Sequence, residues 1–129
     1  RVAGTPSRGG WTVGLEDPLH PDQDLARMRP TGGGVATSST GRRRWTLADG
    51  TDVHHLLDPG TGAPATPALA GVSVLAGEAW WAETLTKAVL VGAVPVDRLG
   101  ELGASGIGRR RTGELVGTAD LLDLVRGAA

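Results

Sequence analysis

The sequence predicts a mixed fold of β-strands and α-helices, and three observations carry that prediction. Several short segments alternate apolar with small or polar residues, as half-buried strands do. Asp49 and Gly50 form a turn signal typical of a two-residue hairpin loop. Residues 78–91 place apolar side chains on one stripe at the spacing of an α-helix.

The first third of the chain predicts a loop, a strand, a polar segment and a second strand. Residues 1–10 are rich in Gly, Pro and Arg, which favours a loop. Residues 11–15 alternate like a strand, and Pro18 ends it because proline cannot continue a ladder of hydrogen bonds. Residues 18–31 are polar and predict no regular element. Residues 35–38 are predicted to be the second strand.

Residues 42–57 are predicted to form a hairpin around Asp49 and Gly50. A type I′ turn needs positive φ at both loop positions, which Asp-Gly tolerates well. The expected cross-strand partners are Ala48 with Thr51, Trp45 with His54, and Arg44 with His55. Because side chains alternate along a strand, the more apolar face, predicted to pack on the core, carries Trp45, Leu47, His54 and Leu56. His55 falls on the more polar face, beside Arg44.

The rest of the chain predicts alternating strands and helices. Residues 58–64 form a rigid turn rich in Pro and Gly, and residues 70–76 form a strand. The helix at 78–91 ends at Gly92. The remaining predicted elements are a short helix at 95–102, a strand at 107–112 and a last helix or strand at 119–126.

Composition excludes several classes of protein. The chain has 129 residues, 40% hydrophobic and 21% charged, so residues 1–129 are expected to be one domain or part of one. Cysteine is absent, which excludes disulfides and thiolate zinc sites. A formal net charge of −1 gives no general attraction to nucleic acid, and no nucleic-acid partner is predicted. The runs 42–44 and 109–111 are all Arg, but alternation splits each run between two faces, so we interpret them as solvated edges.

The three histidines do not predict a metal site. His54 and His55 are neighbours on a strand and point to opposite faces, so they cannot share one ion. His20 lies in a polar loop. His55 is a candidate general base because the ordinary pKa of histidine suits neutral pH. Taken from the residues alone, an ordinary surface or hydrogen-bonded histidine is the favoured interpretation.

Two further features have a plain and a functional interpretation. Lys87 is the only lysine, and its spacing from Glu83 is that of a simple helix ion pair, which is favoured on spacing alone. Trp80 on the same stripe suggests a pocket or an interface. Residues 32–41 combine glycines with hydroxyl side chains and could hold phosphate oxygens, although this signal is weak by itself.

Read in order, several motifs resemble one family. The signatures are WTVGLEDP at 11–18, VATSS at 35–39, DGTDVHHLLDPGTGAP at 49–64, VSVLA at 72–76 and AETLTKA at 82–88. The chain resembles the C-terminal half of the ApbE family, the FAD:protein FMN transferases. The resemblance implies an α+β fold in which an antiparallel sheet packs against helices.

The resemblance also implies an activity and a set of site residues. Family members transfer FMN from FAD to a Thr hydroxyl of an acceptor flavoprotein, with a divalent metal, usually Mg²⁺. His55 matches the family's active-site histidine and is expected to be the catalytic base. Thr37 and Ser38 match a segment near the cofactor, and Asp58 and Thr61 match the loop after the histidine. All four are predicted to contribute to cofactor binding; the alternative for Asp58 and Thr61 is that they only hold the shape of that loop.

This sequence departs from the family pattern on the helix. The family has A-D-x-L-x-T-A, whose Asp and Thr bind the metal; here Glu83 stands for the Asp and Lys87 for the Thr. Glu83 is therefore the predicted metal ligand. A charged lysine cannot bind a metal, so our hypothesis is that the Lys87 ammonium takes the place of Mg²⁺ beside the pyrophosphate.

The sequence also resembles only half of a family member. It begins at Arg1 without a signal-peptide pattern, so we interpret it as the inside of a longer protein. A half-site should bind FAD weakly, and a truncated sheet edge could support a homo-oligomer. Many family members are extracytoplasmic lipoproteins; no anchor is visible here. The alternatives are an FAD-binding homologue without transfer activity and a structural domain that only contacts partners.

Overall fold

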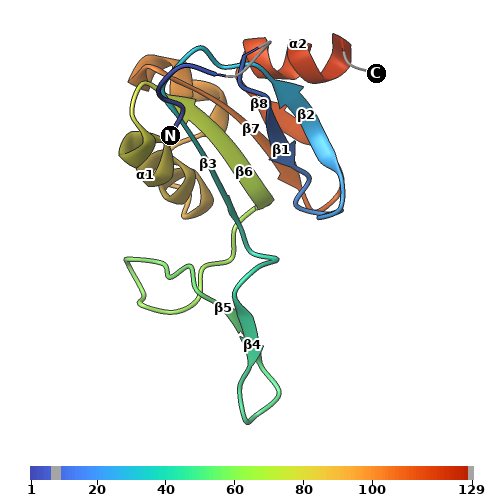
Figure 1. Ribbon diagram of the computed structural model, residues 1–129. Coiled ribbons are helices and arrows are strands. Elements are labelled where there is room, and N and C mark those ends of the chain that lie inside the picture. The colour runs from blue at the N-terminus through green and yellow to red at the C-terminus, as the bar shows by residue number, and fades with distance from the viewer. Residues whose placement is uncertain (7–9, 128–129) are drawn as a thin grey trace.

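The structure is a computed structural model that describes residues 1–6 and 10–127, so part of the predicted loop at 1–10 lies outside the described residues. The elements are β1 (Val13–Glu16), β2 (Asp24–Met28), β3 (Gly34–Ser39), β4 (Arg44–Thr46), β5 (Asp52–His54), β6 (Leu69–Ala76), α1 (Ala79–Leu90), η1 (Val96–Leu102), β7 (Ala104–Arg110), β8 (Leu115–Gly117) and α2 (Ala119–Gly127). Three groups of antiparallel strands are connected by loops; α1 and η1 lie between β6 and β7 in the chain, and α2 follows β8 (Figure 1).

The centre of the molecule is a four-stranded sheet in the order β3-β6-β7-β8. Its pairings are all antiparallel, and so are those of the separate β1-β2 and β4-β5 pairs. Helices α1 and η1 cover one face of the sheet, while the β1-β2 ribbon and α2 lie on the other (Figure 1). The fold is therefore α+β with antiparallel sheets and packed helices, as the resemblance implied.

Strand alternation gives each face of the sheet its own core. On the α1 side, Val74 packs with Leu85 and Leu99. On the other side, Ile107 packs with Leu15. Because neighbouring positions on a strand point to opposite faces, one set of strands supplies both cores.

Glycine lets the helices approach the sheet closely. A Cβ on Gly34 would lie 2.2 Å from the Cα of Ala79, the first residue of α1. A Cβ on Gly106 would lie 2.3 Å from Cδ1 of Leu99 in η1. The first contact is with backbone that cannot move without the helix, so position 34 requires glycine; at position 106 the Leu99 side chain would have to shift.

A buried carboxylate fastens the β1-β2 ribbon to the central sheet. Asp17, at the end of β1, is 3% exposed and forms an ion pair with Arg109 of β7. It also accepts a hydrogen bond from the Leu19 N–H at 2.9 Å and contacts His20 Nδ1 at 3.0 Å. Burial on its own would raise the pKa of Asp17, but the Leu19 N–H, His20 and Arg109 together lower it.

Most predicted elements are confirmed, but two strands were missed. Strands occur at or near the predicted segments 11–15, 35–38, 70–76 and 107–112. The helices predicted at 78–91 and 95–102 are α1 and η1. The last segment is a helix, and the short helix at 95–102 is of the 3-10 type. β2 was missed because its sequence, DLARM, buries only Ala26 and so shows little alternation. β8 has only 3 residues, too few for a periodic pattern.

The hairpin loop is longer than predicted. The Leu47 N–H donates to the Thr51 carbonyl at 2.8 Å, so residues 48–50 form a three-residue loop. Gly50 has φ +85°, whereas Asp49 does not have a positive φ. A three-residue loop with glycine in the left-handed region is the next most common hairpin after the type I′ form. The predicted type I′ turn is therefore wrong.

The longer loop shifts the hairpin register by one residue. Arg44 pairs with His54, and Trp45 pairs with Val53. The slip places Val53, and not His54, on the same face as Trp45, so the predicted face is wrong; of its members, Leu56 is buried in the core. Val53 is buried, whereas Trp45 is 51% and Leu47 45% exposed. The β4-β5 hairpin extends away from the central sheet, which leaves these two side chains in solvent (Figure 1).

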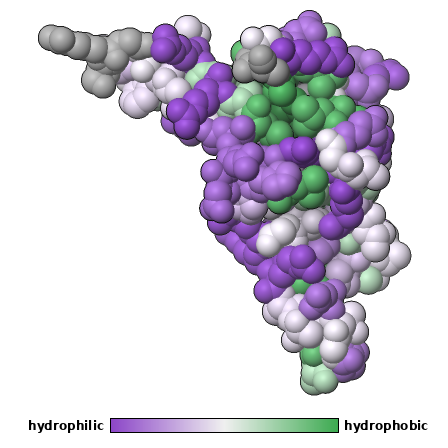
Figure 2. Space-filling view, turned by 90° about the vertical axis from the view of Figure 1, so that its right-hand side faces the viewer, coloured by the Kyte–Doolittle hydropathy of each residue, from purple (hydrophilic) through white to green (hydrophobic). Residues whose placement is uncertain are grey.

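The face on the β2 and α2 side carries an apolar patch in its upper half, and the hairpin forms a narrow projection below it (Figure 2). Partly buried apolar side chains on this side include Met28, Leu122 and Val125. Within the ranges 1–6 and 10–127, the chain contains no helix with the length and apolar character needed to cross a membrane.

Candidate functional site

A cavity of about 240 Å³ lies at the end of β3, between α1 and the segments that lead into and out of the β4-β5 hairpin. It brings together five of the seven predicted site residues, from parts of the sequence far apart. The lining residues are Glu16, Thr37, Ser38, Ser39, Arg42, Arg43, His55, Glu83 and Lys87.

Ser38 connects the sheet to the cavity side of α1. Its Oγ lies 2.8 Å from Thr86 Oγ1, and both residues are buried. The Thr86 hydroxyl donates its proton to the Glu83 carbonyl at 2.8 Å, so the Ser38 hydroxyl must donate to Thr86. Ser38 therefore fixes the helical turn that carries Glu83 and Lys87, and keeps only acceptor capacity for a ligand.

Thr37 lies on the other side of the strand. Its Oγ1 is 2.8 Å from Ser73 Oγ, on the neighbouring strand β6. Thr37 and Ser38 thus line one cavity while their hydroxyls bond to different elements. Because Thr37 is exposed, its hydroxyl is the more accessible of the two.

His55 is a half-buried imidazole surrounded by cations. Its Nδ1 is buried and has no hydrogen-bond partner among the described residues. Burial lowers the pKa of His55 below its ordinary value of 6.5, and the positive charges of Arg43 and Lys87 lower it further, against a hydrogen bond to the Arg43 backbone. The imidazole is therefore neutral near pH 7 and able to accept a proton.

His54 and His55 lie in different cavities, as their positions on the strand predicted. His54 lines a separate cavity of about 610 Å³ next to the hairpin, and its Nδ1 accepts a hydrogen bond from the Leu56 N–H at 3.2 Å. His20 contacts Asp17 instead. The three histidines are thus dispersed.

Each carboxylate in the cavity of His55 already has a cation. Glu83 forms an ion pair with Lys87, one turn along α1. Glu16, at the end of β1, forms two hydrogen bonds with Arg42, at 2.8 and 3.1 Å. Within the described ranges, no group of three or more His, Asp or Glu side chains could hold a metal ion. The residues present do not fit the Mg²⁺ that the resemblance implies, because a divalent ion needs uncommitted oxygen ligands.

Asp58 and Thr61 lie outside this cavity and shape their own loop. Asp58 Oδ1 accepts a hydrogen bond from the Gly60 N–H at 2.7 Å, and Thr61 Oγ1 accepts one from the Ala63 N–H at 3.3 Å. Backbone bonds between Asp58 and Ala63 close the same turn at 2.8 Å. This loop begins three residues after His55, and the Ala65 N–H closes its base by donating to the Leu56 carbonyl at 2.9 Å.

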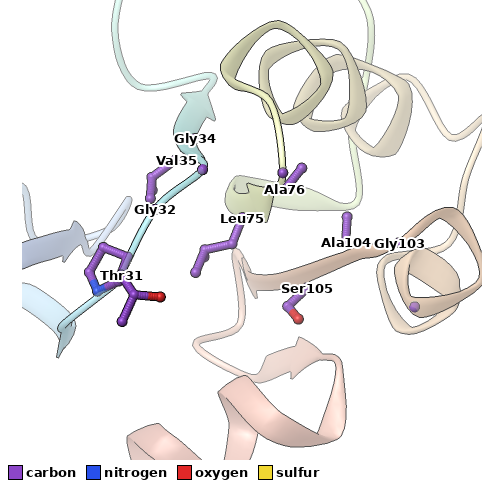
Figure 3. A pocket seen from close by; sticks show the side chains of 13 residues that line it. Thr31, Gly32, Gly34, Val35, Leu75, Ala76, Gly103, Ala104 and Ser105 are labelled. Carbon is purple, nitrogen blue, oxygen red and sulfur yellow. The ribbon is translucent and has the colours of Figure 1, made fainter. Parts of the chain in front are cut away.

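A wider cavity of about 580 Å³ lies at the other end of β3 (Figure 3). Thr31, Gly34, Ala76 and Ser105 are among the small residues that line it. None of its lining residues is titratable, so it offers no group for acid–base chemistry. The smaller cavity with His55 is therefore the candidate site.

Four lining residues were not among the predicted site residues: Glu16, Ser39, Arg42 and Arg43. Arg42 and Arg43 were interpreted as part of a solvated edge, but Arg42 holds Glu16 and Arg43 lines the cavity beside His55. The predicted split between two faces is wrong for Arg42 and Arg43, which precede β4 and line the same cavity, whereas Arg44 in β4 pairs with Asp52 of β5 at 3.5 Å. The position of these residues between the VATSS and HHLLDP motifs was the signal that could have placed them at the site.

Comparison with known proteins decides the family. Residues 1–99 match the sequence profile of the ApbE family. The chain belongs to the ApbE family. Among solved structures it is similar to the ApbE protein of Thermotoga maritima, with 28% identity, a TM-score of 0.76, and coverage of 90% of this chain and 38% of that one.

A second ApbE structure is also similar. The apo form of the flavinyl transferase ApbE of Pseudomonas stutzeri is 25% identical, with a TM-score of 0.63, and the match covers 90% of this chain and 37% of that one. The chain thus spans less than two fifths of the length of either protein. No curated protein matches it.

Proposed function

We propose that the chain takes part in FAD:protein FMN transfer, in which FMN moves from FAD to a Thr hydroxyl of an acceptor flavoprotein. The observation that carries the proposal is the neutral, half-buried His55 in one cavity with the cations Arg43 and Lys87. Membership of the ApbE family and the likeness to a flavinyl transferase support the same reaction.

The reaction needs one bond to form and one to break. The acceptor Thr oxygen forms a bond to the FMN phosphorus, and the bond from that phosphorus to the bridging oxygen of the pyrophosphate breaks. AMP leaves with the bridging oxygen and its charge. The hydroxyl proton moves to the imidazole of His55, which a lowered pKa keeps unprotonated and ready to receive it.

Positive side chains near the pyrophosphate would stabilise the transition state. Phosphoryl transfer depends on positioning and on neutralising negative charge, with little covalent work for the protein. Lys87 and Arg43 supply such charge in the cavity. Since Lys87 stands where the family has a metal-binding Thr, we propose that its ammonium carries out the neutralisation assigned elsewhere in the family to Mg²⁺.

The test is a mass measurement on an acceptor. The protein is incubated with FAD and a Thr-containing acceptor flavoprotein, and the acceptor is weighed by mass spectrometry. A gain equal to one esterified FMN, absent with His55→Ala and kept with His54→Ala, would establish the transferase and its base. Transfer that survives in His55→Ala would remove His55 from the mechanism.

The two residues of α1 that differ from the family pattern favour one alternative, an FAD-binding homologue without transfer activity. Glu83 and Lys87 form an ion pair at the two positions where the resemblance implies metal ligands. If the acceptor gains no mass while FAD still binds, this alternative holds and the transferase proposal fails.

A further inference from the structure

Arg43 has an unusual backbone conformation. It is the one non-glycine residue among those described with a positive φ, at +51°. A residue with a Cβ is strained in this left-handed region, where glycine or asparagine is usual. Such strain persists where surrounding structure maintains it and is often found at binding sites. The position of Arg43 between β3 and β4 therefore suggests a functional constraint.

Arg43 is also the unbalanced charge of the cavity. Two of the three cationic side chains that line it are paired with carboxylates, Arg42 with Glu16 and Lys87 with Glu83. In the described part of the chain, Arg43 has no carboxylate within ion-pair distance, and its cation is close enough to lower the pKa of His55. An unpaired guanidinium in a cavity is suited to an anion.

We propose that Arg43 is an anion-binding residue, which holds a phosphate group of a diphosphate-containing ligand next to His55. The planar guanidinium can donate two parallel hydrogen bonds to one phosphate, a geometry that an ammonium cannot provide. Arg43 has this left-handed backbone and lines the cavity, while the next residue, Arg44, pairs with Asp52 on the hairpin. This inference rests on the proposed function for its choice of a diphosphate.

The test measures binding of inorganic pyrophosphate to the protein by calorimetry, in buffer containing EDTA. We expect Arg43→Gln to weaken binding by at least about tenfold, the effect of losing a charged hydrogen-bonding pair. The matched control is Arg44→Gln, which removes an equal charge from the adjacent residue and should change the affinity less than about twofold. Equal losses in both variants would indicate a general effect of charge and overturn the proposal, as would an absence of binding by the unaltered protein.

Arg43→Gly tests whether the charge of Arg43 acts independently of its effect on folding. Glycine adopts a positive φ without strain, so this variant should unfold at the same temperature as the unaltered protein or a higher one. It should nevertheless lose pyrophosphate affinity to the same extent as Arg43→Gln. Full affinity in Arg43→Gly would show that the guanidinium does not bind the anion.

The outcome is distinguishable from that of the transferase proposal. Pyrophosphate binding that depends on Arg43, in a protein that transfers no FMN, would leave the anion site standing and remove the activity. FMN transfer that proceeds normally in Arg43→Gln would leave the activity standing and overturn the anion site.

Discussion

The hydroxyl of Ser38 donates a hydrogen bond to Thr86 Oγ1 at 2.8 Å, which ties the end of β3 to the middle of α1. The bond is buried and lies directly behind the turn that bears Glu83 and Lys87. The cavity thus depends on a polar contact within an otherwise apolar sheet–helix interface.

Ser38→Ala should lower the free energy of unfolding by about 1–2 kcal/mol, the usual cost of removing a buried hydrogen bond. Thr86→Val should cost a similar amount, and the double variant should cost less than the sum. Urea denaturation measures all three. Thr84→Ala is the control, because Thr84 bonds only to the Trp80 carbonyl on the exposed face of the same helix. Additive losses would show that the two hydroxyls do not interact.

The close approach of α1 to β3 predicts a severe effect of Gly34→Ala. The new Cβ would lie 2.2 Å from backbone of Ala79, which cannot move without displacing the helix. We expect a loss of about 2–3 kcal/mol in unfolding free energy, as for overpacked cores. Gly77→Ala, where a Cβ meets nothing within 4 Å, should be nearly neutral. Similar melting temperatures for the two variants would contradict the packing.

The Asp17–Arg109 ion pair should make stability depend on acid pH. The pKa of Asp17 is below its ordinary value of 3.8 in the folded state, so the stabilisation is complete above that pH and is lost as the pH falls through the lowered pKa. Asp17→Asn should cost about 2–3 kcal/mol near pH 7 by leaving Arg109 without its carboxylate. Asp24→Asn, which affects an exposed pair with Arg27, should change little. Denaturation curves from pH 2 to 7 would show whether the loss of unfolding free energy at low pH disappears in Asp17→Asn.

His55 should titrate below pH 6.5, because burial and the nearby cations disfavour its charged form. A lowered folded-state pKa means that protonation opposes folding, so the contribution of His55 to stability is complete above 6.5 and falls as the pH drops through the lowered pKa. Proton NMR of the imidazole measures the titration directly. Arg43→Gln should raise this pKa, whereas Arg44→Gln should leave it unchanged; equal effects would contradict the proximity of Arg43.

Removal of divalent metal tests the role of Lys87. If the ammonium neutralises the pyrophosphate, FMN transfer should continue in EDTA. Lys87→Thr, which restores the residue type implied by the resemblance, should make transfer more dependent on Mg²⁺. Complete loss of transfer in EDTA that Mg²⁺ restores in the unaltered protein would contradict the ammonium hypothesis.

The sequence predicted those elements whose burial follows a clear period. The apolar stripe of α1 and the apolar run of the long buried strand β6 can both be recognised from the sequence alone. The hairpin register could not be predicted, because Asp49-Gly50 is compatible with both a two-residue loop and the three-residue loop that the structure has. The loop length decides that Trp45 lies opposite Val53 and not opposite His54.

The candidate site residues were chosen from the order of motifs along the chain. Five of them lie in one cavity because the fold brings the ends of distant segments together. His55, Glu83 and Lys87 lie in one cavity, and the roles assigned to them stay predictions. Arg43 could not be distinguished from Arg42 and Arg44 in the sequence, since a left-handed backbone leaves no trace in a run of identical residues. Asp58 and Thr61 belong to the family motif, but their side chains bond within the loop.

Most of the residues that line the cavity lie in or next to two separately hydrogen-bonded units, the β4-β5 hairpin and the central sheet with α1. Arg43 and His55 sit where the chain enters and leaves the β4-β5 hairpin, while Ser38 and Lys87 belong to the central sheet and α1. The distance across the cavity is therefore set by the angle of the hairpin to the sheet. A substitution in the exposed hairpin can alter the spacing between base and cation while every residue of the cavity keeps its identity.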